Sequence, residues 1–198
     1  MFTGIIESVG LVTKIVKSND LNKIFIHSSL NIENVKIGDS ISVNGVCLTI
    51  TDIIDDIFIF DAVKETLEIT NLKFLEKNSQ VNLERSLMLS DRIDGHIVQG
   101  HIESMGNVVD IISSEEQMEL FIKIQKREGK YCIKKGSIAI NGISLTIADI
   151  NENVLKFCII PHTLKNTTLN SMNNGDYVNI ETDMLSKYVE RIIEYNDV

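Results

Sequence analysis

Four side chains of this sequence could take part in nucleophilic or proton-transfer chemistry: the thiol of Cys47, the imidazole of His101, the hydroxyl of Ser144 and the carboxylate of Asp183. A thiol or hydroxyl can act as a nucleophile, whereas imidazole and carboxylate groups move protons. No established catalytic spacing joins them, because the sequence has no GxGxxG, P-loop, HExxH or GxSxG motif. His96 and His101 lie five residues apart and would face opposite sides of a strand, which argues against a shared metal ion. Each histidine alone is more often structural than a ligand.

The feature that draws attention to these four residues is an internal repeat. Residues 44–50 read Asn-Gly-Val-Cys-Leu-Thr-Ile and residues 141–147 read Asn-Gly-Ile-Ser-Leu-Thr-Ile, an offset of 141 − 44 = 97. Further matches join residues 64–67 to 161–164, 81–84 to 178–181 and, at an offset of 96, 4–10 to 100–106. A repeat of this length has the size of a small domain rather than of a solenoid unit. The chain therefore reads as a tandem duplication, which predicts two equivalent pockets.

The four residues stand at places where the two copies differ. The replaced pairs are Cys47 and Ser144, Ile5 and His101, Ser86 and Asp183, Phe2 and Val98, and Thr3 and Gln99. Packing alone gives little reason for a histidine or a carboxylate at these positions. Duplicated domains also drift, so any single difference is more often neutral than functional. By default Cys47 is a small buried apolar residue, and Ser144 and Thr146 are strand hydroxyls bonded to the backbone.

Short β-rich segments separated by turn residues must position these groups. The predicted strands cover residues 23–27, 40–43 and 57–60 in the first copy and 120–124, 137–140 and 154–158 in the second. Asn-Gly at residues 44–45 and 141–142 predicts a tight hairpin turn with positive φ in each copy. Residues 66–72 and 163–169 are expected to form short helical turns. Many short strands in about 90 residues favour a small antiparallel barrel or sandwich.

One apparent length difference separates the copies. Residues 38–44 read Gly-Asp-Ser-Ile-Ser-Val-Asn, whereas residues 136–141 read Gly-Ser-Ile-Ala-Ile-Asn, one residue fewer. A strand absorbs an extra residue most easily as a β-bulge. We therefore expect a bulge near Gly38 in the first copy.

An amphipathic helix is predicted over residues 185–195, beyond both repeats. Its apolar stripe consists of Leu185, Tyr188, Val189, Ile192 and Ile193. A lone helix of this length is marginal in water and must pack on something. Packing in a homo-oligomer and packing on its own barrel are equally compatible with the pattern.

Composition excludes several classes of protein. The 198 residues are 43% hydrophobic and carry a net charge of −9, with a pI near 4.9, which argues against a nucleic-acid binder. No run of 18 apolar residues indicates a membrane span, and the start of the chain does not resemble a signal peptide. Three cysteines without a CxxC pair indicate free thiols and a cytoplasmic location.

Taken together, residues 1–7, 44–49, 64–67, 100–102, 141–146 and 179–183 resemble the riboflavin synthase family, alpha-chain type. The resemblance implies an all-β fold of two tandem six-stranded antiparallel Greek-key β-barrels plus a C-terminal α-helix. The implied domains are an N-terminal lumazine-binding barrel at 1–93, a C-terminal lumazine-binding barrel at 94–185 and an oligomerisation helix at 186–198. It further implies a homotrimer whose active sites lie between the N-terminal barrel of one chain and the C-terminal barrel of its neighbour.

The activity that this resemblance implies is a dismutation of two 6,7-dimethyl-8-ribityllumazine molecules. A four-carbon unit moves from one to the other, giving riboflavin and 5-amino-6-ribitylamino-uracil, with no metal or redox cofactor. The implied catalytic residues are Ser144, His101, Asp183 and Cys47. The implied substrate-binding residues are Phe2, Thr3, Gly4, Ser40, Val46, Thr49, Glu65, Thr66, His101, Lys135, Thr146, Ile160 and Thr163.

Several points stay open at this level. A water molecule, a ribityl hydroxyl, Ser144 or Cys47 could each be the nucleophile. His162 stands where an acidic residue is expected in the family pattern. Two other functions are compatible with the same barrels: a non-catalytic antenna protein that holds a lumazine or flavin, and a binding module of unrelated function. Turnover separates the enzyme from the antenna, and indifference to lumazines would identify the unrelated module.

Overall fold

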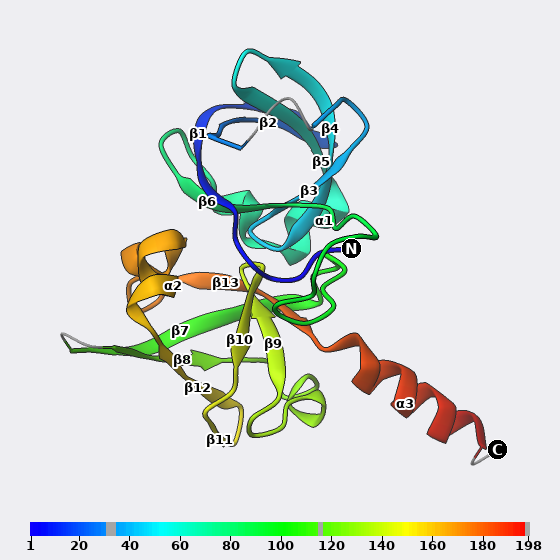
Figure 1. The fold of residues 1–198 in the computed structure, drawn as a ribbon, viewed down its shortest axis with the longest axis vertical. Coiled ribbons are helices and arrows are strands. Elements are labelled where there is room, and N and C mark those ends of the chain that lie inside the picture. Colours follow the sequence, from blue (N-terminus) through cyan, green and yellow to red (C-terminus); the bar gives the residue numbers. More distant parts are fainter. Residues whose placement is uncertain (31–34, 115–116, 197–198) are drawn as a thin grey trace.

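Alternation of buried and exposed side chains marks the strands of this protein. In β2 (Leu21–His27), Asn22, Ile24 and Ile26 are buried while the residues between them reach the surface. This period of two places one face of each strand against a core. The computed structural model describes residues 1–30, 35–114 and 117–196 and forms two stacked β-structures with one helix that leads away from them (Figure 1).

The first copy forms a closed antiparallel barrel with the strand order β1-β2-β5-β4-β3-β6. Its strands are β1 (Ser8–Lys17), β2, β3 (Ser40–Val43), β4 (Val46–Ile54), β5 (Ile57–Val63) and β6 (Gln80–Arg85). A short helix α1 (Lys64–Ile69) and a 3₁₀ turn η2 (Asn71–Phe74) connect β5 to β6. The predicted barrel and the predicted helical turn are therefore confirmed in this copy.

The second copy repeats the layout as a curled sheet with the order β10-β9-β13-β7-β8-β12-β11. Its elements are β7 (Ser104–Ser113), β8 (Met118–Lys123), η3 (Gly129–Tyr131), β9 (Ser137–Ile140), β10 (Ile143–Thr146), β11 (Asp149–Asn151), β12 (Val154–Ile159), α2 (Pro161–Asn166), η4 (Thr168–Ser171) and β13 (Tyr177–Thr182). The two edge strands, β10 and β11, are consecutive in the chain and together correspond to β4. The sheet thus curls until both of its edges meet at one interrupted strand.

That interruption falls at a bulge position that both copies share. In β4 the register shifts between Ile50 and Asp52, and the hydroxyl of Thr51 donates to Ile59 O at 3.2 Å. The counterpart of Thr51 is Ala148, which has no hydroxyl and lies between β10 and β11. Its backbone N still donates to Lys156 O at 2.8 Å. Seven strands replace the expected six because the same strand is counted in two pieces.

The bulge predicted near Gly38 is wrong. Gly38 N donates to Ile50 O and Lys135 N donates to Ile147 O, so Gly38 corresponds to Lys135 rather than to Gly136. The copies have equal length here. The offset changes instead between β2 and β3, because the pairs Lys17–Asn22 and Ser113–Met118 still differ by 96, whereas Gly38 and Lys135 differ by 97.

Each β-structure has its own apolar core, built from side chains of the same strands. The first core includes Ile24, Ile41 and Phe60, and the second includes Leu120, Ile138 and Phe157. The two cores are separate clusters. Each copy therefore folds around its own interior, as a tandem duplication requires.

Asparagines join the two copies about the Asn-Gly turns. Asn44 and Asn141 have φ values of 47° and 46°, which confirms the predicted turns. Asn82 Nδ2 donates to Asn141 O at 3.0 Å, and Asn179 Nδ2 donates to Asn44 O at 2.8 Å. Both side chains are fully buried. Each turn is therefore held by a buried amide of the opposite copy, which fixes how the two β-structures sit together.

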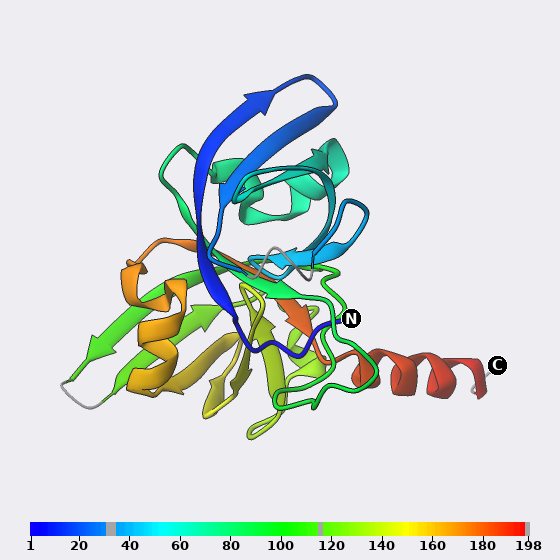
Figure 2. The ribbon, with the colours of Figure 1, turned by 45° about the horizontal axis from the view of Figure 1, so that its top comes forward.

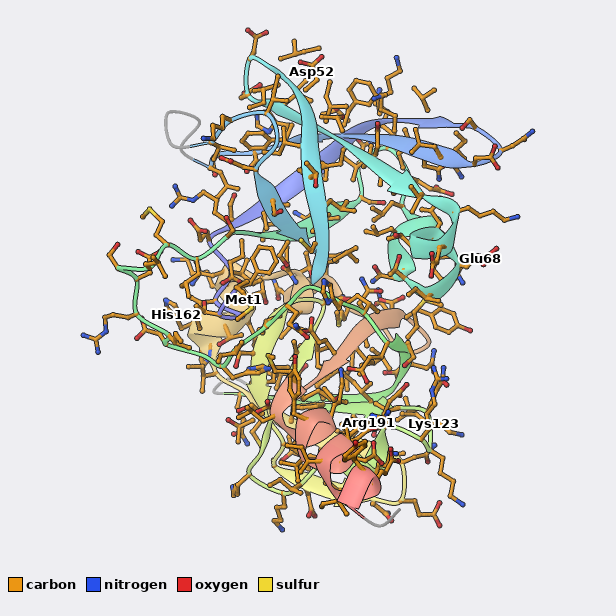
Figure 3. The ribbon with its side chains drawn as sticks, turned by 90° about the vertical axis from the view of Figure 1, so that its right-hand side faces the viewer. Met1, Asp52, Glu68, Lys123, His162 and Arg191 are labelled. Atoms are coloured by element: carbon orange, nitrogen blue, oxygen red, sulfur yellow. The ribbon has the colours of Figure 1, made fainter. Side chains whose placement is uncertain are left out.

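The helix α3 (Met184–Asn196) leaves the second β-structure with its apolar stripe exposed. Figures 1 and 2 show it extending away from both β-structures, and in Figure 3, where it points toward the viewer, no other segment lies in front of it. Lys187 Nζ contacts Glu103 Oε1 at 2.5 Å, and Lys130 and Tyr131 bind Glu190. The stripe residues Leu185, Tyr188, Val189, Ile192 and Ile193 are each 55–61% exposed. The expectation that this stripe packs on its own barrel is contradicted; residues 197–198 of the predicted segment lie outside the described residues.

Candidate functional site

Two short arms cross between the β-structures. The first arm, residues 1–7, precedes β1, and the second arm, residues 97–103, precedes β7. Gly4 O in the first arm accepts a hydrogen bond from Ser144 N at 2.8 Å, and Gly100 O in the second arm accepts one from Cys47 N at 2.9 Å. Each arm therefore contacts the opposite copy at the position where the copies exchange cysteine for serine.

Only glycine fits at the crossing points. Gly4 and Gly100 have φ values of 78° and 82°, in the left-handed region that disfavours other residues. A Cβ on Gly4 would lie 2.6 Å from Ser144 Cβ, and one on Gly100 would lie 2.6 Å from Cys47 Cβ. The backbone of each arm thus lies directly against the side chain that faces it.

The arms also bind one another. Phe2 N donates to Val98 O at 2.7 Å, and Val98 N donates to Phe2 O at 3.0 Å. Phe2 is 1% exposed and packs with Val98 and Ala139, against which Cys47 is also packed. Phe2 therefore lies between the copies, on the side of Cys47.

A buried glutamate anchors each arm to its own copy. Glu84 accepts bonds from Thr3 N at 2.6 Å and Gly4 N at 3.0 Å, and Glu181 accepts bonds from Gln99 N at 2.7 Å and Gly100 N at 2.9 Å. Burial raises the pKa of both carboxyls, and the backbone donors oppose that rise. Each glutamate thus fixes its arm at the residues that contact the opposite copy.

Beside the first arm, Ser144 meets a histidine. Ser144 Oγ lies 2.7 Å from His96 Nδ1, and His96 N donates to Thr3 O at 3.1 Å. Burial lowers the pKa of His96, and the negative charge of Asp183 opposes that shift. The ring is therefore neutral at pH 7, and one of its nitrogens can act as an acceptor.

The other two candidate catalytic residues lie close to the same elements. His101 follows Gly100 in the second arm, and its backbone N donates to Glu181 Oε2 at 3.1 Å. That bond ties His101 to its own copy, next to Gly100, whose carbonyl accepts from Cys47 N. Asp183 precedes α3, where its Oδ1 accepts from Leu185 N at 3.0 Å. Two separate groups therefore lie within one chain: Cys47 beside the Gly100–His101 segment of the second arm, whose Gly100 O binds Cys47 N, and Ser144 with His96 beside the first arm.

The remaining strand candidates flank these two groups. Ser40 pairs with Thr49 across β3 and β4, and Val46 opens β4. Thr146 ends β10, two residues after Ser144. Lys135 lies in the turn before β9, with φ of 69°. Ser40, Val46 and Thr49 therefore lie on the strand pair that carries Cys47, whereas Lys135 and Thr146 belong to the copy that carries Ser144.

The candidates on helices are not joined to either group by the described hydrogen bonds. Glu65 and Thr66 lie in α1, Thr163 lies in α2, and Ile160 precedes α2 and is 61% exposed. Thr66 O and Thr163 O accept equivalent bonds at 2.7 Å from the threonines four residues later. These contacts stabilise the helix ends in both copies.

His96 is the residue that sequence comparison missed. The matched positions of the two copies begin at Phe2 and Val98, so the comparison of the copies does not reach residue 96. Its five-residue spacing from His101 did not indicate a metal site either. Only the approach of residue 96 to Ser144, 48 residues away, marks it.

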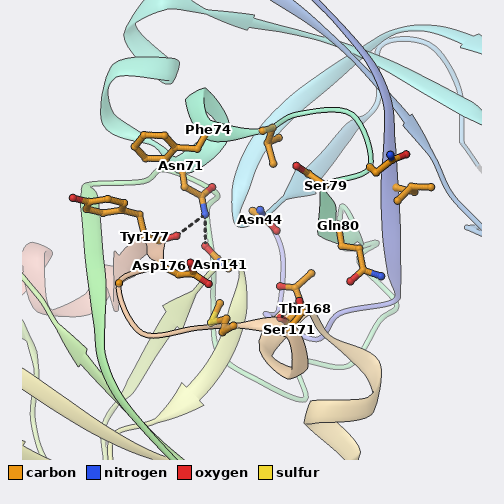
Figure 4. Close-up of a pocket in the computed structure, with 15 residues that line it drawn as sticks. Asn44, Asn71, Phe74, Ser79, Gln80, Asn141, Thr168, Ser171, Asp176 and Tyr177 are labelled. Atoms are coloured by element: carbon orange, nitrogen blue, oxygen red, sulfur yellow. Dashed lines mark hydrogen bonds between the residues drawn. The ribbon is translucent and has the colours of Figure 1, made fainter.

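A cavity between the copies lies elsewhere. It has a volume of about 600 Å³ and is lined by Asn44, Asn71, Phe74, Asn141, Tyr177 and other residues (Figure 4). Asn71 Nδ2 donates there to Asn141 Oδ1 at 3.0 Å and to Tyr177 O at 3.1 Å. None of the candidate site residues lines it. The amides of this cavity join the copies and are separate from the groups at Cys47 and Ser144.

The three cysteines are free thiols, as the sequence predicts. Burial raises the pKa of the Cys132 thiol to about 11, so that it stays protonated and unreactive at neutral pH. Cys47 is half-buried and Cys158 is exposed. Within the described ranges, no group of three or more His, Cys, Asp or Glu side chains could hold a metal ion, and no helix could cross a membrane.

The lumazine binding domain family matches this chain twice, at residues 3–86 and 99–183. The riboflavin synthase of Actinobacillus pleuropneumoniae is 42% identical, over 98% of this chain and 90% of its own length. That of Bacillus subtilis is 38% identical over the same shares of the two chains. That of Mycobacterium bovis is 40% identical over 98% of each chain.

Solved structures agree in fold. LumP complexed with riboflavin has a TM-score of 0.87 and 29% identity, covering 92% of this chain and 99% of LumP. LumP complexed with 6,7-dimethyl-8-(1'-D-ribityl) lumazine has a TM-score of 0.84 with the same identity and coverage. The described relatives thus share both copies of the repeat.

Proposed function

Because this chain belongs to the riboflavin synthase family of lumazine-binding proteins, we propose that it dismutates two molecules of 6,7-dimethyl-8-ribityllumazine. One molecule gives up a four-carbon unit and leaves as 5-amino-6-ribitylamino-uracil. The other accepts the unit and becomes riboflavin. The full-length match to riboflavin synthases, together with the two equivalent arm crossings, is the observation that carries this proposal.

The duplication has a chemical purpose in this reaction. Two copies of one substrate must meet face to face, and two related pockets bind them in complementary orientations. Fixing both reactants in contact removes roughly 7–11 kcal/mol of the barrier, because the entropy of bringing them together is already lost on binding. No metal or redox cofactor is needed for that contribution.

The candidate residues divide between the pockets. The first pocket takes Cys47 and His101 with Ser40, Val46, Thr49, Glu65 and Thr66; the second takes Ser144 and Asp183 with Thr3, Gly4, Lys135, Thr146, Ile160 and Thr163. Phe2 lies between them. Small polar groups suit a ribityl chain, since a buried hydroxyl without a partner is costly. His101 and Asp183 assist proton movement or orientation.

The two pockets of one chain serve different active sites. Each active site forms between the first pocket of one chain and the second pocket of its neighbour in a homotrimer. The exposed apolar stripe of α3 supports this assembly, as does a groove of about 590 Å³ along it, lined partly by Leu185, Val189 and Ile193. Free thiols fit a cytoplasmic location for the enzyme.

A non-catalytic antenna protein is the second candidate, because LumP is similar over nearly the whole chain. Its fold would hold a lumazine or flavin without reaction. Identities of 38–42% to riboflavin synthases, against 29% to LumP, favour the enzyme. The presence of Cys47, His101, Ser144 and Asp183 points the same way.

Carbon labelling tests the proposed transfer itself. Lumazine with ¹³C at its four transferable carbons is mixed with an equal amount of unlabelled lumazine, and the products are analysed by mass spectrometry. We expect riboflavin with no, one or two labelled units, the singly labelled form being twice as abundant as either other form. The uracil product should carry no label. Label retained in the uracil, or riboflavin without the singly labelled form, would refute the four-carbon transfer between two molecules.

A further inference from the structure

The environment of Ser144 differs from that of Cys47 in one chemical respect. Residues 95–96 pass directly over Ser144, where a Cβ on Gly95 would lie 3.1 Å from Ser144 Oγ and 2.1 Å from Thr3 O. The absence of that Cβ allows the His96 ring to reach Ser144 Oγ at 2.7 Å.

That contact is the ring's one polar contact within the described residues. His96 Nε2 is buried there without a hydrogen-bond partner, whereas Nδ1 faces Ser144 Oγ. Burial lowers the pKa of His96, which keeps the ring neutral at pH 7. One nitrogen of the neutral ring carries no proton. Burying a polar ring is unfavourable unless the ring is hydrogen-bonded. The contact with Ser144 therefore compensates for the partial burial of the imidazole.

We propose that His96 is the positioning residue for Ser144, and that it fixes the rotamer and hydroxyl proton of Ser144 toward the lumazine in the second pocket. This inference rests on the proposed function and deepens it. The first pocket presents the thiol of Cys47 where the second presents the hydroxyl of Ser144, so the two pockets treat identical substrates differently. That asymmetry would give one lumazine the donor role and the other the acceptor role.

A double-mutant cycle tests whether His96 acts through Ser144. The variants are His96→Ala, Ser144→Ala, the double variant and His96→Asn, with His27→Ala as the control at the exposed end of β2, where His27 pairs with Asp56. We expect His96→Ala to lower kcat about 10- to 100-fold while KM changes less, because the half-buried hydroxyl of Ser144 loses its partner. The double variant should be no slower than Ser144→Ala. His96→Asn should recover part of the loss, since an amide atom can occupy the place of Nδ1.

Turnover by the wild-type chain decides the proposed function separately from this assignment. The same cycle is therefore also run on the dissociation constant of 6,7-dimethyl-8-ribityllumazine, measured by fluorescence, which requires no turnover. Non-additive effects of the two alanines on that constant support the assignment even in a chain that does not turn over. The assignment is overturned if the losses caused by the two alanines multiply in both readouts. It is also overturned if His96→Ala behaves like His27→Ala. His96→Asn keeps the test available if His96→Ala does not fold.

Discussion

Replacing Gly100 by alanine is expected to lower riboflavin formation on the order of 100-fold, because a displacement of about 1 Å at a reacting centre has an effect of that size. The new Cβ would lie 2.6 Å from Cys47 Cβ and 2.8 Å from Cys47 N, and both atoms belong to strand β4. The second arm would move away from the first pocket and take His101 with it. Steady-state turnover with 6,7-dimethyl-8-ribityllumazine measures the loss.

Gly38→Ala is the matched control for this substitution. Gly38 also has a positive φ, of 94°, but a Cβ there would meet nothing within 4 Å. Both variants carry the left-handed strain of about 1–2 kcal/mol, whereas only Gly100→Ala adds the clash with Cys47. Gly4→Ala should produce the equivalent defect at Ser144. Equal turnover of Gly100→Ala and Gly38→Ala would show that the arm crossing does not shape the first pocket.

Deleting residues 186–198 is expected to lower turnover about 100-fold or more while lumazine binding changes by only a few-fold. Each chain keeps both of its pockets, but the first pocket of one chain no longer meets the second pocket of its neighbour. Sizing chromatography should show loss of the trimer, and fluorescence titration should show that lumazine still binds. Equal loss of binding and turnover, or a truncated chain that remains a fully active trimer, would contradict the proposed assembly.

A point variant separates the apolar stripe from the ion pairs that the deletion also removes. Ile192→Lys places a charge on the stripe, which is 61% exposed at this residue. Arg191→Gln changes the opposite face and leaves the stripe intact. Only the first variant should dissociate the trimer, because a lysine cannot enter an apolar interface without a partner.

The elements of this fold follow closely from local patterns. Strands at residues 40–43 and 137–140 agree with β3 and β9, since β-branched residues between turn signals specify a short strand. The Asn-Gly pairs specify their turns through positive φ. The alignment of Gly38 with Gly136 failed because a positive φ is not confined to glycine: Lys135 occupies the same position with φ of 69°.

The site follows from the sequence only in part. Comparison of the copies singled out Cys47 and Ser144, and the structure brings each against a glycine of the opposite arm. The crossing itself joins Gly4 to residue 144 and depends on how the two copies pack, which no local pattern encodes. His96 escaped comparison because the matched positions of the two copies begin at Phe2 and Val98, so only its distance to Ser144 marks it.

The most direct test of this account is to incubate the purified chain with 6,7-dimethyl-8-ribityllumazine, without added metal or nucleotide, and to follow riboflavin by absorbance and fluorescence. The account predicts riboflavin at half the molar amount of lumazine consumed, since two substrates give one riboflavin. Tight binding of lumazine without turnover would contradict it and would identify an antenna or carrier protein instead.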